Sequence, residues 1–311
     1  MINHSSVTEF LLMGFSDDRQ MQIFHFGIFL SIYFIALTGN FLLIIAVALN
    51  HNLHSPMYFF LVNLSFSDVG YISATVPKSM ADSWTNNKLI SFSGCFAQVF
   101  SVIAFGSVEL ALLTVMAYDR YIAICCPLQY TIIMNWVACI QMAAASWTLG
   151  VLNGVIETGM TFRLNFCSTN IIRQFFCDMP QLQKISCTDT QANHILVTVL
   201  GSIVGVFCVG GISVSYGYIF SAVLKISSDQ GRYRAFSTCI PHLTIFSLFV
   251  ITTMFSYVRP KELSFPTLDL LSALLYAVLP PVLNPIIYSL RNKDIQESVL
   301  KIPKKLKRFI M

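Results

Sequence analysis

The stretch Met116–Tyr130, MAYDRYIAICCPLQY, ends a long apolar run with an adjacent acid and base, Asp119 and Arg120. Burying such a pair in a soluble core costs several kcal/mol unless the charges are paired or hydrated. At a membrane boundary, the arginine can reach headgroups or water while the preceding residues stay in hydrocarbon. The stretch therefore predicts a membrane-spanning helix that ends here, with Arg120 as an anchor or as part of a switch.

The composition of the whole chain favours a membrane protein. Of its 311 residues, 55% are hydrophobic and only 11% are charged, against roughly 25% charged in soluble domains. The mean hydropathy is +0.68. Residues 291–311 hold seven Lys or Arg and two acids. This imbalance predicts a cytoplasmic tail that faces membrane lipid, rather than a domain that binds nucleic acid.

Apolar runs long enough to cross a bilayer, about 20 residues each, occur seven times. An odd number places the termini on opposite sides, and the basic tail places the C-terminus inside. Residues 1–22 are then extracellular, where Asn3 of the triplet Asn3-His4-Ser5 can carry a glycan. The predicted fold is an all-α membrane protein, a seven-transmembrane helix bundle over residues 23–290 with a short amphipathic C-terminal helix. The expected spans lie near residues 23–49, 57–79, 95–121, 138–158, 194–225, 236–258 and 269–290.

Four of the nine cysteines fall on the expected outer face. Cys167, Cys177 and Cys187 lie between the fourth and fifth spans, and Cys95 opens the third. An even number in an oxidising compartment predicts two disulfides, and the spacing alone allows three pairings. The other five cysteines are expected to be reduced.

Polar side chains inside the spans are a further feature. Asp68 and Glu109 each lie about eleven residues from the inner end of their span, which places both roughly 16 Å above the inner surface. Asn40 and Asn284 lie somewhat nearer the inside. Two carboxyl groups at one depth can recruit water or a cation such as Na⁺ and form a functional polar hub. Alternatively, they hold the helices together by hydrogen bonds.

Two prolines near the C-terminus predict local changes in helix geometry. Pro285 removes a backbone hydrogen bond and creates a hinge above Tyr288, with Asn284 placed to satisfy the freed groups. The tail alternates charged and apolar residues, as a helix lying on a membrane surface does. Pro303 is expected to break or kink that helix.

Six stretches, in this order along the chain, resemble the motifs of the vertebrate olfactory receptors, which are rhodopsin-like G-protein-coupled receptors. The resemblance covers nearly the whole chain, and its style is that of the larger, tetrapod-type class. The matching stretches are Gly39-Asn40, LHSPMYFFLVNLSFSD (53–68), MAYDRYIAICCPLQY (116–130), SYGYIFSAVLKI (215–226), RAFSTCIPHL (234–243) and PVLNPIIYSLRNKD (281–294).

The resemblance implies a switch at the inner face. Arg120 would contact the G protein once the sixth span moves outward, and Asp119 would restrain Arg120 at rest. Tyr216 and Tyr288 would swing toward Arg120 in the active state. Residues 225–238 and the tail would complete the surface that binds the G protein.

The resemblance also resolves the disulfides and implies the partners. It pairs Cys95 with Cys177 and Cys167 with Cys187. The expected ligand is a small volatile odorant, and the expected partner is a stimulatory olfactory-type heterotrimeric G protein that raises cyclic AMP. The expected location is the plasma membrane. No cofactor and no enzymatic activity are expected.

Three positions depart from the family pattern. Cys126 stands where the family usually has His, and Pro241 replaces the usual Ser before His242. Val250-Ile251 replaces a Tyr-Gly pair whose tyrosine normally relays ligand binding near the pocket floor. The usual relay is therefore in doubt, and the expected pocket floor is more apolar here.

The resemblance places the ligand pocket in the outer half of the bundle, between the third, fifth, sixth and seventh spans. A mostly apolar lining with few hydroxyl groups suits small volatile ligands. The residues expected to line this pocket are Val102, Ile103, Gly106, Ser107, Val204, Phe207, Thr253, Met254, Tyr257, Leu274 and Ala277.

Other functions account for less of the sequence. A transporter or channel would use Asp68 and Glu109 as ion ligands, but the sequence shows no inverted repeat or pair of broken helices. An intramembrane protease would need a second carboxylate in a Gly-x-Gly-Asp motif, which the sequence lacks. The same receptor fold used outside the nose, or as an attachment receptor, is the alternative that stays open.

Overall fold

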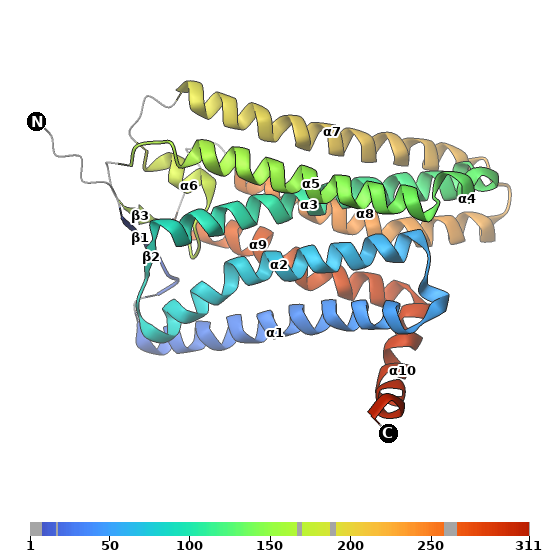
Figure 1. The fold of residues 1–311 in the computed structure, drawn as a ribbon, viewed down its shortest axis with the longest axis horizontal. Helices are drawn as coiled ribbons and strands as arrows, with labels where there is room; N and C mark the ends of the chain where they lie inside the picture. The colour runs from blue at the N-terminus through green and yellow to red at the C-terminus, as the bar shows by residue number, and fades with distance from the viewer. Residues whose placement is uncertain (1–7, 17, 167–169, 187–190, 258–265, 311) are drawn as a thin grey trace, which may run out of the picture.

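Seven long apolar helices run side by side and form the body of the protein (Figure 1). The computed structural model describes residues 8–16, 18–166, 170–186, 191–257 and 266–310. Within this part of the chain, the seven helices are long and apolar enough to cross a membrane, which confirms the predicted fold class. They are α1 (Arg19–Leu49), α2 (Pro56–Thr85), α3 (Phe92–Cys125), α5 (Trp136–Thr161), α7 (Gln191–Leu224), α8 (Asp229–Tyr257) and α9 (Pro266–Arg291).

Local polar residues determine several of the helix ends. Asp18, Ser91 and Asn135 accept hydrogen bonds from backbone amides in the first turns of α1, α3 and α5. Asn86 ends α2 in the left-handed conformation, with φ of 56°. The helices therefore extend beyond the apolar stretches of the sequence, since capping rather than hydropathy fixes where each one starts and stops.

The end of the bundle where α1 begins carries a small three-stranded sheet, which the sequence does not predict. The strands are β1 (Glu9–Leu12), β2 (Leu89–Ser91) and β3 (Ile171–Ile172), in the order β2-β1-β3. β1 pairs antiparallel with β2 and parallel with β3. Phe10 and Leu12 of β1 are buried beneath it. The segment before α1 is thereby joined to two loops at this end (Figure 1).

Close contact between α3 and α5 depends on glycine. A Cβ atom added at Gly150 would lie 2.3 Å from Val108 Cγ2 and 2.7 Å from the Ala104 carbonyl oxygen, both in α3. A Cβ atom at Gly154 would lie 2.9 Å from Ala104 Cβ. Small residues allow two membrane helices to approach this closely, so their backbones pack directly.

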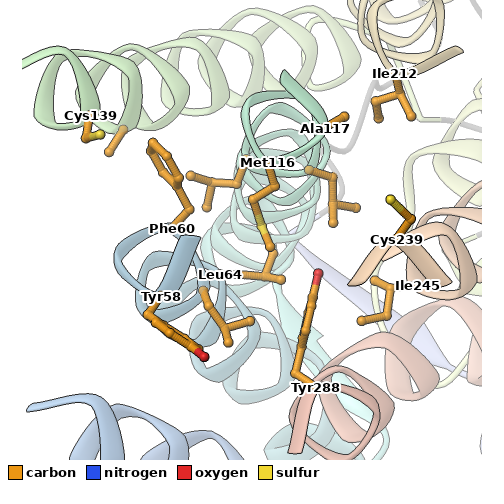
Figure 2. Packing of buried hydrophobic residues seen from close by; sticks show 14 of the residues in the cluster. Tyr58, Phe60, Leu64, Met116, Ala117, Cys139, Ile212, Cys239, Ile245 and Tyr288 are labelled. Carbon is orange, nitrogen blue, oxygen red and sulfur yellow. The ribbon is translucent and has the colours of Figure 1, made fainter. Parts of the chain in front are cut away.

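A large buried apolar cluster fills the half of the bundle that contains the end of α3. Figure 2 shows the Tyr288 side chain of α9 among Leu64 of α2, Met116 of α3 and Ile245 of α8. All seven long helices contribute side chains to this core, and the Tyr288 ring lies within it.

The remaining elements are short, except for a helix at the C-terminus. Helix α10 leaves the bundle at a steep angle (Figure 1). It continues through Pro303, so the predicted break is wrong; the rest of its backbone ladder outweighs the one hydrogen bond that proline removes. The elements outside the seven long helices and the sheet are η1 (His51–Leu53), η2 (Pro127–Gln129), α4 (Tyr130–Ile133), α6 (Met179–Lys184) and α10 (Lys293–Ile310).

Candidate functional site

The acid and base at the end of α3 form a closed ion pair. Asp119 is fully buried, and its Oδ2 accepts hydrogen bonds from Arg120 Nη2 and, at 2.9 Å, from Arg120 Nε. Its Oδ1 accepts a hydrogen bond from the Tyr130 hydroxyl at 2.8 Å. All three residues belong to the stretch Met116–Tyr130. Asp119 thus holds Arg120 in place, and Tyr130 in turn holds Asp119.

Tyr130 is a member of this group that the sequence analysis does not identify. It begins α4, in the connection that follows α3. Burial and then the neighbouring Asp119 carboxylate raise the pKa of the Tyr130 phenol above its ordinary value. The phenol therefore stays protonated and can donate its hydrogen bond at physiological pH.

Tyr216, one of the two predicted switch tyrosines, is engaged by a histidine. The Tyr216 hydroxyl lies 2.8 Å from His242 Nδ1, and His242 Nε2 lies 2.9 Å from the Leu113 carbonyl oxygen. Because a carbonyl can only accept, Nε2 carries the proton and Nδ1 accepts from the tyrosine hydroxyl. His242 thus links α7, α8 and α3, a role that the sequence analysis does not assign.

Tyr288, the other switch tyrosine, is buried in the apolar cluster of Figure 2. Within the described part of the chain, its hydroxyl group has no hydrogen-bond partner. The side chain is nevertheless close enough to Arg120 to interact with it electrostatically. Such a buried unsatisfied hydroxyl group carries a cost of about 1–3 kcal/mol, so a rearrangement that supplies a partner would be favourable.

Three of the four predicted hub residues meet in the middle of the bundle. Asn284 Nδ2 lies 3.0 Å from both carboxylate oxygens of Asp68 and 3.0 Å from Glu109 Oε1. All three side chains are buried. The equal depth predicted for the two acids therefore brings them to one amide, which joins α2, α3 and α9.

Asn40 bonds to a backbone carbonyl of α9 and not to the other hub residues. Its Nδ2 donates to the Pro281 carbonyl oxygen at 2.9 Å, while Gly39 beside it leaves room for the Pro285 ring. The Pro281 carbonyl is the group that loses its helical partner, since Pro285 has no N–H. The sequence analysis gives this task to Asn284, which is wrong: Asn284 bonds the acids, and Asn40 satisfies the freed carbonyl.

The residues expected to line one ligand pocket face several directions. Val102, Leu274 and Ala277 share an apolar cluster, but Ile103 belongs to another cluster, with Leu182 of α6. Gly106 lies against Tyr71, Ser107 is bonded to Asn153, and Val204 and Thr253 are half-buried. Helical spacing alone does not show which neighbour a face meets.

Two members of the predicted lining are on open surface. Phe207 is 78% exposed and Met254 is 54% exposed, so neither belongs to an enclosed pocket, and this part of the prediction is wrong. In a membrane helix, an apolar side chain is as stable against lipid as against a ligand, so hydropathy cannot separate the two. Tyr257 ends α8, and its side chain lies outside the described part of the structure.

The predicted covalent features are described only in part. A disulfide joins Cys95 to Cys177, with Cα atoms 5.4 Å apart. Cys167, Cys187 and the glycosylation site Asn3 lie outside the described residues. Of the family departures, Cys126 is a half-buried free thiol, Pro241 lies inside α8, and Val250-Ile251 passes from half-buried to exposed.

The loop that contains the disulfide cysteine Cys177 is fixed to the helices beneath it. Gln98 Oε1 accepts from the Cys177 amide at 2.8 Å, and the Ser79 hydroxyl donates to the Phe175 carbonyl at 2.8 Å. The Tyr276 hydroxyl donates to Asp178 at 2.5 Å. The loop therefore bonds to α2, α3 and α9, and covers the end of the bundle that carries the three-stranded sheet.

This fold and this arrangement of polar groups define a class, the rhodopsin-like seven-helix receptors. The structure is similar to the crystal structure of squid rhodopsin, with a TM-score of 0.68 and 19% sequence identity, over 93% of this chain and 87% of that one. That identity is low, so the likeness concerns the fold.

Sequence comparison narrows the class to a family. The family profile described as Olfactory receptor matches residues 29–305. The chain is 45% identical to human (Homo sapiens) Olfactory receptor 14A2, over 98% of this chain and 97% of that protein. It is 47% identical to human Olfactory receptor 14A16, over 95% and 96%. The chain belongs to the olfactory receptor family. It is therefore a multi-pass membrane receptor of the G-protein-coupled type, and not an enzyme.

Proposed function

We propose that this receptor binds small, mostly apolar volatile molecules in the outer half of its helix bundle and activates a stimulatory olfactory-type G protein, which raises cyclic AMP. The N-terminus is extracellular and the C-terminus cytoplasmic in the plasma membrane. The observation that carries the proposal is the Asp119–Arg120–Tyr130 group, a closed ion pair at the end of α3. Opening this pair would free Arg120 to meet the G protein.

Two tyrosines support a switch at this position. Tyr216 already has a partner, His242, whereas the buried Tyr288 hydroxyl group has none within the described segments. Both rings lie within electrostatic reach of Arg120. Once Asp119 releases Arg120, the two hydroxyl groups can supply new partners for the guanidinium group, and this exchange stabilises the active state.

The polar hub supports a connection between the ligand and the switch. Asp68, Glu109 and Asn284 join α2, α3 and α9, and the Asn284 Oδ1 atom has no partner among the described residues. Carboxylate and amide oxygens are the ligands that hard cations prefer. These three residues would therefore hold a Na⁺ ion, which would neutralise the buried acids and favour the resting arrangement.

The test is an odorant panel in cells with a cyclic AMP reporter, applied to the wild type and to Arg120→Ala. We expect an odorant-dependent rise in the wild type and none in the variant, at equal surface expression. Arg173→Ala is the matched control, since Arg173 is an exposed arginine in the loop that carries β3. Normal signalling by Arg120→Ala would overturn the switch, and a response through another second messenger would overturn the stimulatory coupling.

A further inference from the structure

A cavity of about 210 Å³ lies where α1, η1 and α10 meet, at the end of α1 opposite the three-stranded sheet (Figure 1). The volume is several times the roughly 30 Å³ that one water molecule occupies in the liquid, so the cavity can admit a larger polar group. The polar part of its lining consists of Asn50, Asn52, Ser298 and Lys301. The switch and the hub use none of these residues, so the cavity is a separate candidate site.

Hydrogen bonds fix one side of the cavity and leave donors on the other. Asn50 Nδ2 donates to Ser298 Oγ at 2.6 Å, and Asn50 Oδ1 accepts from the Asn52 backbone amide at 3.2 Å. The end of α1 is thereby bonded directly to α10. Asn50 keeps a second N–H, and the exposed side-chain amide of Asn52 has no partner within the described part of the chain.

Lys301 adds a positive charge to these donors. Its Nζ atom lies 3.1 Å from Glu297 Oε2, and both side chains are more than half exposed. An exposed pair one helical turn apart contributes little to stability, so Glu297 does not hold the ammonium group strongly. The ammonium group has three N–H donors and Glu297 accepts one of them. Lys301 and the two asparagine amides can therefore donate together to one anion.

The apolar part of the lining places the cavity at a membrane boundary. It consists of Ala46, Leu49 and Ile302, and α1 is a membrane-spanning helix that ends at Leu49. Four more basic residues follow in α10, between positions 304 and 308, and basic residues beside a membrane attract anionic lipids. A phosphate monoester carries more than one negative charge and three acceptor oxygens, which complements the donors of this cavity.

We propose that the cavity binds the headgroup of a phosphorylated phosphatidylinositol. The phosphate monoester lies between Lys301 and the side-chain amides of Asn50 and Asn52, and the lipid chains follow the apolar lining. A lipid bound there joins α10 to the end of α1. The inference goes beyond the proposed function but rests on its orientation, since these lipids belong to the cytoplasmic leaflet.

The test measures the affinity of the purified receptor, in phosphatidylcholine nanodiscs, for a monophosphorylated phosphatidylinositol with a fluorescent acyl chain. Lys301→Gln should weaken binding by about tenfold and Asn52→Ala by about threefold, because each removes hydrogen bonds to a charged group. Glu297→Gln should strengthen binding by about twofold, since the ammonium group loses a competing acceptor. All three side chains are exposed, so the variants should fold. Lys225→Gln makes the same change of charge at an exposed residue after α7, and this matched control should bind like the wild type.

The uncharged substitution separates a defined site from a general attraction between basic residues and anionic lipid. If Asn52→Ala leaves the affinity unchanged, or Lys225→Gln weakens it as much as Lys301→Gln does, the cavity is not the site and the proposal is overturned. The soluble inositol phosphate that forms the headgroup is the second probe. It should bind at least about tenfold more weakly, because it has no chains to contact the apolar lining. Equal affinity would assign the cavity to a soluble phosphate compound and overturn the lipid.

The result is independent of the proposed coupling. Both faces of a nanodisc are open to solvent, so the affinity depends neither on the orientation of the receptor nor on cyclic AMP. If odorants raise cyclic AMP but the lipid does not bind through Lys301, this inference alone fails. If the lipid binds as expected but no odorant raises cyclic AMP, the lipid site stands and the proposed function fails.

Discussion

The bond from Asn40 to the Pro281 carbonyl allows a sharp test of how the seventh membrane helix is held. Pro285 has no N–H, so the Pro281 carbonyl lacks its helical donor, and Asn40 Nδ2 fills that place at 2.9 Å. Asn40→Ala leaves the buried carbonyl unsatisfied, at a cost of about 1–3 kcal/mol. The free energy of unfolding should fall by that amount, or by a little less, since the substitution also removes the unpartnered Asn40 Oδ1 atom.

A double-mutant cycle isolates the bond from these side effects. Pro285→Ala restores the N–H that α9 lacks, so the helix itself can satisfy the Pro281 carbonyl. In that background, Asn40→Ala should cost about 1–3 kcal/mol less than it does in the wild type. The assay is thermal unfolding of all four receptors in the same lipid nanodisc, where about 2–4 °C corresponds to each kcal/mol. Additive effects of the two substitutions would refute the reasoning, because the cost of Asn40→Ala would then be unrelated to the proline.

Three further predictions concern the helix contact, the switch and the disulfide. Gly150→Ala should lower the free energy of unfolding by about 1–3 kcal/mol, since the new Cβ atom would lie 2.7 Å from the α3 backbone. Gly159→Ala is the control: its new Cβ atom has open space, so the free energy of unfolding should change by less than about 0.5 kcal/mol. Equal unfolding temperatures of the two variants would contradict this prediction. Tyr130→Phe removes a hydrogen bond to a carboxylate, worth about 1.5–3 kcal/mol. Cyclic AMP without odorant should therefore rise at equal surface expression, and an unchanged basal level would show that Asp119 holds Arg120 without the tyrosine. Cys177→Ser removes a disulfide that joins residues 82 positions apart. The loss of this constraint on the unfolded chain should destabilise the folded receptor by about 4–5 kcal/mol. Surface expression measured by flow cytometry should therefore fall sharply, and normal expression would contradict that estimate.

Much of the fold could be predicted, because the bilayer imposes helices of known length on any chain that crosses it. The three-stranded sheet could not, since its strands have two to four residues and pair across segments far apart in the sequence. The α2 end also escaped prediction. There Lys78 and Asp82 form an ion pair one turn apart, so the helix continues past the point where the apolar run ends.

Counting residues along the helices predicts the depth of the polar hub residues but not their hydrogen-bond partners. Counting residues placed Asp68 and Glu109 at one depth, and both do bond to Asn284. Depth does not reveal which amide faces which helix: Asn284 belongs to the hub as predicted, but Asn40 bonds to the Pro281 carbonyl instead. The predicted ligand lining is least accurate for the same reason, since residue counting does not show that Phe207 lies on an exposed face of α7.

The contacts of α9 suggest how a signal can travel through the bundle. At the outer end, Tyr276 bonds to Asp178 of the loop that covers the bundle. Lower down, Pro281 is held by Asn40, and Asn284 by the two buried acids. At the other end of α9, the Tyr288 hydroxyl group has no hydrogen-bond partner among the described residues. A helix with prolines along its middle is weakest where hydrogen bonds are missing, and here Asn40 of α1 replaces the bond that the Pro281 carbonyl loses. A change in the contact at Tyr276 would therefore be expected to pass along α9 toward Tyr288, which lies within electrostatic reach of Arg120.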